Sequence, residues 1–267
     1  MANRLDATFA RLRQDARKGF IAYLTAGDPD LPRSLEAARA LARAGADVIE
    51  LGVPFSDPLA DGPTNQAAAQ RALEAGTTVV KLLAAIREFR RDCDVPLVLF
   101  TYLNPVFTYG FERFHADAAA AGVDGILILD LPPEEEALSE SFSHRHGLRS
   151  IRLIAPTTPP ERMERIARRA EGFIYYVSRE GVTGEQTQLA DTIAGQVAEI
   201  RRHTDLPIAV GFGISTPEQA AEAARSADAV VVGSAIVRRV GEFGRTASLA
   251  AKIESFTRPL VEAVKSV

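Results

Sequence analysis

Eight short apolar runs recur along the chain between longer amphipathic stretches, and this alternation constrains the fold more than any other feature. Each run has five to seven residues, is rich in Val, Ile, Leu and aromatic side chains, and is bounded by Gly, Pro or Asp. Such runs are typical of parallel strands buried on both faces. They are Phe20–Thr25, Asp47–Gly52, Pro96–Tyr102, Gly125–Leu131, Ser150–Ala155, Phe173–Ser178, Pro207–Gly211 and Ala229–Gly233. The intervening stretches, such as Leu31–Ala44 and Pro159–Ala170, have helical periodicity.

Eight strands alternating with helices leave two architectures, a closed (β/α)8 barrel and an open doubly wound sheet. A spacing of roughly 33 residues per unit favours the barrel. The first strand is followed by Ala26-Gly27-Asp28-Pro29, which is not the dinucleotide-binding turn of the open alternative. No linker or composition shift divides the chain. We therefore predict that residues 1–267 form a single α/β domain, a (β/α)8 TIM barrel with an extra N-terminal helix.

Composition narrows the class of protein. The net charge is −4, whereas a nucleic-acid-binding surface needs a basic stripe, which is missing here. No apolar run reaches the roughly 18 residues that cross a bilayer, and the charged N-terminal segment lacks a secretory core. The single cysteine, Cys93, excludes an internal disulfide and a cysteine-cluster metal site. We expect a cytoplasmic protein that binds neither nucleic acid nor membrane.

Two connections are longer than the others. About 45 residues separate the second and third runs, where the long loop Pro54–Pro63 precedes a helical pattern over Thr78–Asp92. About 30 separate the sixth and seventh, with the polar, Gly-containing stretch Arg179–Leu189 between them. Barrel chemistry is carried on loops that follow the strands, so both long loops are candidate walls or lids of a site. A surface insertion is the alternative for either loop.

Acidic side chains occupy informative positions. Glu50 lies near the carboxyl end of a strand expected to be buried, where an ionised carboxylate is costly unless it is paired or used. Burial raises a carboxyl pKa toward neutrality, which suits proton transfer, although a structural ion pair is the alternative. Asp61 fits either catalysis or turn formation, and Asp57 fits a turn or a helix cap. Asp130 is expected to cap the helix Glu134–Ser143 or to support a neighbouring loop.

Paired glycines follow the last two strands, in Gly211–Ser215 and in Val232–Ala235. Glycines let backbone amides approach a ligand, and helix N-termini favour anions. Loops after the seventh and eighth strands commonly bind phosphate in such barrels. No Lys or Arg lies between Phe212 and Arg225 or within Val232–Val237, so we predict a phosphate held by N–H groups. Ordinary glycine turns are the alternative.

The histidines and lysines do not lie where metal, Schiff-base or nucleophilic catalysis in a barrel would need them. The histidines lie outside the strands and the strand-end loops, and they are His115, His144, His146 and His203. The lysines fall in helical or N-terminal segments, and they are Lys18, Lys81, Lys252 and Lys265. This pattern argues against a metal site, a Schiff base and a serine nucleophile. Acid–base work by carboxylates is left, assisted by Tyr102, Tyr175 or Tyr176.

One stretch carries a specific signature. Residues Ile49–Thr64, IELGVPFSDPLADGPT, closely resemble the signature of the tryptophan synthase alpha chain family. The match continues in Tyr23–Pro29, Tyr102–Pro105, Gly122–Gly125, Asp130–Pro132, Ala155–Thr158, Ser178–Gly184, Gly211–Ser215 and Val232–Ser234. The resemblance covers essentially the whole chain.

The resemblance implies a barrel lyase of tryptophan biosynthesis. The family splits indole-3-glycerol phosphate into indole and glyceraldehyde 3-phosphate, which is a retro-aldol cleavage. Glu50 is then implied as the general acid–base that protonates indole C3 and takes the glycerol hydroxyl proton. Asp61 is implied to bind and polarise the indole N–H, and Tyr175 matches the family's active-site tyrosine. Two carboxylates in different environments suit these two tasks.

The resemblance also implies the substrate-binding residues. The implied indole slot is Tyr23, Phe100, Leu127, Leu129, Phe212 and Val231, a flat apolar box. The implied phosphate cradle is Gly184, Gly213, Ile214, Gly233 and Ser234. Thr183 matches the loop residue that closes near Asp61, and Tyr102 is a further candidate. Departures from the family include Asn65, which replaces a usual aliphatic residue, and Tyr23, where phenylalanine is often found.

A partner is implied as well. Family members associate with a beta chain that carries pyridoxal phosphate and receives indole through an internal tunnel, so we expect an alpha2-beta2 heterotetramer. No cofactor and no metal are expected in this chain. The loops after the second and sixth strands would then act both as lids and as coupling elements.

Two other functions stay open. One is a different phosphate-handling barrel enzyme, such as an isomerase or a synthase acting on an indole or ribose phosphate. Such an enzyme is expected to show a catalytic lysine, cysteine or metal-binding histidine in its strand-end loops. The other is a non-enzymatic activator of a partner, against which the presence of both Glu50 and Asp61 argues.

Overall fold

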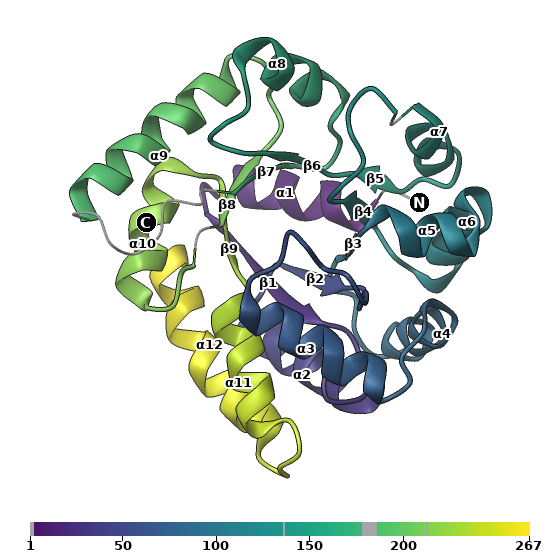
Figure 1. Ribbon diagram of the computed structural model, residues 1–267. Coiled ribbons are helices and arrows are strands. Elements are labelled where there is room, and N and C mark those ends of the chain that lie inside the picture. The colour runs from purple at the N-terminus through teal and green to yellow at the C-terminus, as the bar shows by residue number, and fades with distance from the viewer. Residues whose placement is uncertain (1–2, 136, 178–185, 212) are drawn as a thin grey trace.

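Parallel strands form a barrel surrounded by helices (Figure 1). The computed structural model describes residues 3–135, 137–177, 186–211 and 213–267, without the side chains of residues 138 and 186–192. The strands are β1 (Gly19–Thr25), β2 (Val48–Gly52), β3 (Leu97–Thr101), β4 (Gly125–Ile128), β5 (Arg149–Ser150), β6 (Arg152–Ile154), β7 (Ile174–Val177), β8 (Ile208–Gly211) and β9 (Ala229–Val232). The helices are α1 (Arg4–Gln14), α2 (Leu31–Ala44), α3 (Pro63–Glu74), α4 (Val79–Phe89), α5 (Leu103–Tyr109), α6 (Phe111–Ala121), α7 (Ala137–Arg145), α8 (Pro160–Arg169), α9 (Gln186–Arg201), α10 (Pro217–Ser226), α11 (Ser234–Phe243) and α12 (Leu249–Lys265).

The barrel closes through the fifth predicted strand. The hydrogen-bonded order is β5-β4-β3-β2-β1-β9-β8-β7-β6. β5 and β6 are two parts of the run predicted over Ser150–Ala155, interrupted at Ile151, and they pair with β4 and β7 respectively. The Ile151 N–H still donates to the Ile126 carbonyl at 2.9 Å, so the segment stays hydrogen-bonded to β4. Each of the eight predicted runs therefore contains a strand of the barrel, and the predicted (β/α)8 fold is confirmed.

Side chains alternate between the barrel interior and the layer beneath the helices, as the two-residue period of a strand requires. On β2, Val48 packs inside the barrel with residues of the opposite strands, whereas Ile49 and Leu51 pack outward against helices. Glu50 therefore faces the interior. It is in register with Tyr23 of β1 on one side and with Val98 of β3 on the other.

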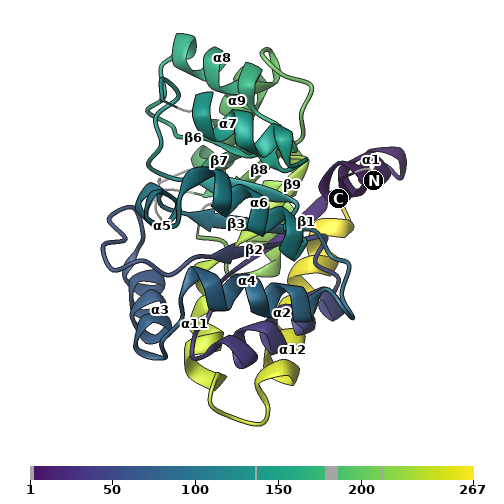
Figure 2. The ribbon, with the colours of Figure 1, turned by 90° about the vertical axis from the view of Figure 1, so that its right-hand side faces the viewer.

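The predicted N-terminal helix, α1, covers one end of the barrel. Its apolar face places Leu5, Phe9 and Leu12 in the interior cluster, and the Phe9 ring lies 5.6 Å from that of Phe173. Figure 2 shows α1 at the opposite end of the barrel from α3 and α5. Because α1 covers the amino ends of the strands, the carboxyl ends are left for the site.

The helix boundaries follow the local capping signals. α2 begins after the N-cap Asp30 and ends before Gly45 in the left-handed region, as its periodicity predicted. Thr216 caps α10 in a capping box with Gln219. The loop after β2 was predicted, but α3 was not, because α3 buries only small side chains and has no apolar stripe of the kind that identifies a helix. No described helix is long and apolar enough to cross a membrane.

Candidate active site

Glu50 is an unpartnered carboxyl group inside the barrel. Its side chain is 0% exposed, and neither carboxylate oxygen has a hydrogen-bond partner among the described residues. Burial raises the pKa of Glu50 from 4.5 to about 8. The carboxyl is therefore mostly protonated at neutral pH, and no cation in the described chain holds it in the charged form. A buried acid of this kind is suited to donating a proton near neutrality.

Two tyrosine hydroxyls fit against backbone that only glycine allows. A Cβ atom on Gly52 would lie 2.2 Å from the Tyr23 hydroxyl, and one on Gly211 would lie 2.7 Å from the Tyr175 hydroxyl. The Phe100 ring stands edge-on to both tyrosines, at 5.2 Å from Tyr23 and 6.4 Å from Tyr175. Burial raises the pKa of both tyrosines, with the Glu50 carboxyl as a further contributor, so their hydroxyls stay protonated beside the acid.

Asp61 is held by side chains from two elements. The Tyr102 hydroxyl, at the end of β3, donates to Asp61 Oδ2 at 2.9 Å, and Asn65 Nδ2 of α3 donates to Oδ1 at 3.3 Å. The Ala60 N–H donates to the same tyrosine oxygen at 3.1 Å, which fixes the loop against the barrel. Partial burial raises the pKa of Asp61, while the Tyr102 and Asn65 hydrogen bonds act to lower it. The two carboxylates thus have different surroundings, one apolar and one hydrogen-bonded.

A cavity of about 400 Å³ opens at the carboxyl ends of the strands. Three groups of residues line it. The strands contribute Tyr23, Phe100, Tyr175, Val177, Gly211 and Val231. The loop after β2 and the start of α3 contribute Gly62, Pro63, Thr64 and Asn65. The segments after β8 and β9 contribute Gly213, Gly233, Ser234 and Arg238, next to the N-terminus of α11. An aromatic wall therefore faces a glycine-rich wall at a helix N-terminus.

The structure brings together much of the predicted site. Of the predicted residues, those that line the cavity are Tyr23, Phe100, Tyr175, Gly213, Val231, Gly233 and Ser234. Leu127 and Leu129 pack in the barrel interior with Phe100, and buried Ile214 packs in the outer layer. The lining residues do not include these three, nor Glu50, Asp61 and Tyr102. Thr183, Gly184 and Phe212 lie outside the described residues, as does most of the predicted loop before α9.

Seven cavity residues were not among the predicted site residues, and they are Gly62, Pro63, Thr64, Asn65, Val177, Gly211 and Arg238. Arg238 lies four positions after Ser234 on α11, so it shares the helix face that points toward the cavity. It makes no ion pair or hydrogen bond with the residues that the structure describes. The i, i+4 spacing from Ser234 was a usable signal, but Arg238 falls one residue beyond Val237, the end of the stretch without Lys or Arg. Asn65 had been noted only as a departure from the family.

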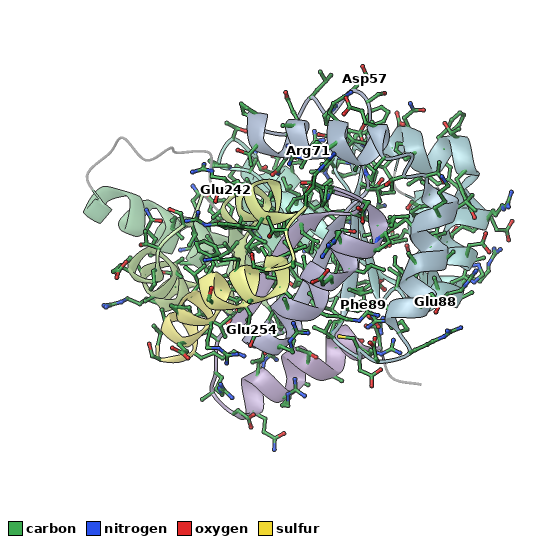
Figure 3. All side chains as sticks on the ribbon, turned by 90° about the horizontal axis from the view of Figure 1, so that it is seen from below. Asp57, Arg71, Glu88, Phe89, Glu242 and Glu254 are labelled. Carbon is green, nitrogen blue, oxygen red and sulfur yellow. The ribbon has the colours of Figure 1, made fainter. Side chains whose placement is uncertain are left out.

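Other acidic and basic residues have structural roles. The Asp130 carboxylate accepts from the Leu103 N–H at 2.6 Å, so it supports the neighbouring loop at the start of α5. Arg71 of α3 forms two 2.7 Å hydrogen bonds with buried Asp28 after β1. Figure 3 shows Arg71 further inside the molecule than Asp57, which lies at its outer edge. The Arg71–Asp28 pair therefore anchors the helix that follows the Asp61 loop.

The described histidines do not enter the cavity. His115 is buried on α6, where its ring nitrogens pair with the Phe111 carbonyl and the Ser139 hydroxyl. The side chain of His144, near the end of α7, is 82% exposed. No group of three or more His, Cys, Asp or Glu that could hold a metal ion occurs in the described parts of the chain.

Comparison with known proteins decides the family. The family model of the tryptophan synthase alpha chain matches residues 9–265. The chain belongs to the tryptophan synthase alpha chain family. It is 50% identical to the alpha chain of Geobacter sulfurreducens, over 98% of this chain and 99% of the relative. It is 51% identical to that of Solibacter usitatus, over 96% of each.

Solved structures agree with this assignment. The tryptophan synthase alpha subunit from Legionella pneumophila superimposes with a TM-score of 0.92 at 37% identity, covering 100% of both chains. A chain of the open form of tryptophan synthase from M. tuberculosis gives a TM-score of 0.89 at 36% identity over 99% of each chain. Membership of the tryptophan synthase alpha chain family confirms the predicted function, a lyase of tryptophan biosynthesis that cleaves indole-3-glycerol phosphate.

Proposed function

We propose that this chain cleaves indole-3-glycerol phosphate with Glu50 as its acid–base group. The observation that carries the proposal is a buried carboxyl, without a partner in the described chain, whose pKa of about 8 keeps it protonated at neutral pH. The proton of Glu50 passes to C3 of the indole, and the resulting carboxylate accepts the proton of the glycerol hydroxyl as the C–C bond breaks. Each such transfer typically contributes roughly 10²–10⁴ in rate. One residue thereby acts first as an acid and then as a base.

Asp61 takes the second task in this proposal. When C3 of the indole is protonated, positive charge develops on the ring nitrogen, and an ionised carboxylate stabilises it. The hydrogen bonds from Tyr102 and Asn65 support the ionised form of Asp61. Tyr23, Phe100 and Val231 give the ring an apolar wall. Tyr175 has a hydroxyl that stays protonated beside Glu50, which suits it to donate to a developing oxygen charge.

The phosphate lies, in this proposal, at the glycine-rich wall. Gly213, Gly233 and Ser234 line it, and α11 begins at Ser234, so backbone N–H groups and the helix dipole favour an anion there. Arg238 adds a positive charge to the same wall. The proposal keeps three roles that the resemblance implies. The indole slot includes Leu127, Leu129 and Phe212, and the phosphate cradle includes Gly184 and Ile214. Thr183 is the loop residue that closes near Asp61.

The chain is further proposed to act with a tryptophan synthase beta chain in an alpha2-beta2 heterotetramer. Leu59 in the loop after β2 is 91% exposed, and Phe107 on α5 is 70% exposed. Both follow strands that lie side by side, and Tyr102 links the loop to the start of α5 through its bond to Ala60. Large exposed apolar side chains beside a site mark an interaction surface. In this proposal the beta chain carries pyridoxal phosphate, and this chain needs no cofactor. The complex is proposed to be cytoplasmic.

An assay of indole release tests the proposal. We propose that the chain is a single barrel domain, so it is purified whole. It is incubated with indole-3-glycerol phosphate, once without and once with a tryptophan synthase beta chain. We expect slow release of indole by the isolated chain and faster release with the partner. Absence of indole in both mixtures would overturn the proposal and favour the activator function. Asp61→Asn is expected to lower the rate roughly 10²-fold or more in either mixture.

A further inference from the structure

Asn65 occupies a position between the cavity and the second carboxylate. It is the third residue of α3, whose N-cap is Gly62. The side chain is half-buried and lines the cavity beside Thr64. The Asn65 amide brings both a hydrogen-bond donor and an acceptor to the cavity wall.

The orientation of the Asn65 amide follows from its partner. Asp61 Oδ1 is an acceptor when the carboxyl is ionised, so the atom that faces it at 3.3 Å is the Asn65 nitrogen. The other carboxylate oxygen accepts from the Tyr102 hydroxyl at 2.9 Å. Each oxygen of Asp61 thus has one donor, from a different element, and the carboxylate is fixed in direction.

The remaining atom of the amide is unsatisfied. Asn65 Oδ1 is buried and has no hydrogen-bond partner among the described residues. A buried carbonyl oxygen without a donor is costly, and such a group in a cavity wall is satisfied when a donor binds there. The glycerol chain of the proposed substrate carries hydroxyl groups, which are donors of the required kind.

We propose that Asn65 is a positioning residue that directs the Asp61 carboxylate and accepts a hydrogen bond from a hydroxyl of the bound glycerol phosphate. This inference rests on the proposed function for the identity of the ligand. The contact with Asp61 is a property of the protein alone. The two halves of the inference are therefore tested by different measurements.

Titration of Asp61 tests the first half. The other groups near Asp61 are Tyr23, Tyr102 and Tyr175, whose pKa values burial raises, so they stay neutral through the titration. Burial raises the pKa of Glu50 to about 8. The Arg238 guanidinium lines the same cavity and stays charged.

The measurement is the ¹³C chemical shift of the Asp61 carboxyl against pH in the ligand-free chain, assigned with Asp61→Asn. Asn65→Leu is expected to raise the midpoint by roughly half to one pH unit, because a hydrogen bond to the charged form is lost. Asn65→Asp places a like charge there and is expected to raise it further. Gln70→Leu is the matched control, since Gln70 is an exposed amide on the same helix that bonds to Glu74. An unchanged midpoint in Asn65→Leu would overturn the first half.

Binding of two phosphate esters tests the second half. Glycerol 3-phosphate has the hydroxyl groups, whereas propyl phosphate lacks them. Calorimetry gives the dissociation constant of each ester. Asn65→Leu is expected to raise the dissociation constant of glycerol 3-phosphate roughly three- to tenfold and to leave that of propyl phosphate unchanged. Gln70→Leu is expected to change neither constant. Equal effects on the two esters would overturn the acceptor role. If neither ester binds the wild-type protein, the proposed phosphate site and the acceptor role both fail, and the titration still decides the role of Asn65 toward Asp61.

Discussion

Replacing Glu50 by Gln should change how the stability of the protein depends on pH. Burial raises the pKa of Glu50 from 4.5 to about 8 in the folded chain, whereas the unfolded chain keeps an ordinary glutamate. Between these two values the folded state holds a proton that the unfolded state has lost. The free energy of unfolding of the wild type therefore falls as pH rises through this window. The side chain in Glu50→Gln does not titrate, so the free energy of unfolding of the variant does not show this fall with pH.

The magnitude follows from the size of the rise. At 1.36 kcal/mol per pH unit, the full rise in the pKa of Glu50 corresponds to a change of about 5 kcal/mol in the free energy of unfolding. Relaxation of the site around the charged carboxylate reduces this change. We expect the free energy of unfolding of the variant, relative to that of the wild type, to increase by roughly 3–5 kcal/mol between pH 5 and pH 9. Any constant cost of burying an amide adds the same offset at every pH and does not alter this slope.

Urea unfolding followed by circular dichroism measures the difference, since the chain has no Trp. Wild type and Glu50→Gln are compared at intervals from pH 5 to pH 9, with equal m-values as the condition for comparison. Glu262→Gln is the matched control, because Glu262 is an exposed glutamate on α12, and no pH-dependent difference is expected. A difference between wild type and Glu50→Gln that stays flat across the range would refute the account of Glu50.

Three further substitutions test the site. Gly52→Ala places a Cβ atom 2.2 Å from the Tyr23 hydroxyl, so we expect a loss of roughly 1–3 kcal/mol in thermal or urea unfolding, with reduced cleavage. Arg71→Leu leaves the buried Asp28 carboxylate without its two 2.7 Å bonds, and we expect a loss of about 2–3 kcal/mol by urea unfolding. Arg238→Gln removes the cation from the cavity wall, so KM should rise roughly tenfold with kcat little changed.

Each of these substitutions has a matched control. Gly195→Ala meets no atom within 4 Å and should not destabilise the chain. Arg113→Leu breaks an exposed pair, for which we expect less than about 1 kcal/mol. Arg239→Gln removes a cation that pairs with Glu242 outside the cavity, and its KM should match the wild type. Equal effects of a substitution and its control would contradict the role assigned to the residue.

The strand positions were predictable because buried parallel strands leave a strong pattern. Runs such as Asp47–Gly52 are continuous, apolar and bounded by turn residues, and each of them overlaps a strand of the structure. The carboxyl-end position of Glu50 followed from the same pattern. α3 was missed because its buried residues are only Ala68, Ala69 and Ala72. Small side chains can pack closely without producing a recognisable hydrophobic stripe.

The site was predictable where one residue type has one physical use. Gly213 and Gly233 stood out because glycine next to a helix start allows close approach of a ligand. Arg238 and Asn65 did not stand out, since arginine and asparagine on a helix are most often solvated. Their roles depend on which way the helix faces, and only the packed barrel shows that both line the cavity. The Tyr102 contact with Asp61 depends likewise on the folded loop.

The most direct test of the central claim is indole release from indole-3-glycerol phosphate by the wild type and by Glu50→Gln, measured side by side at pH 7. Wild type should release indole and glyceraldehyde 3-phosphate in equal amounts. Glu50→Gln, with an unchanged circular dichroism spectrum, should be slower by at least roughly 10²-fold. Equal rates for the two proteins would contradict the assignment of Glu50 as the acid–base group.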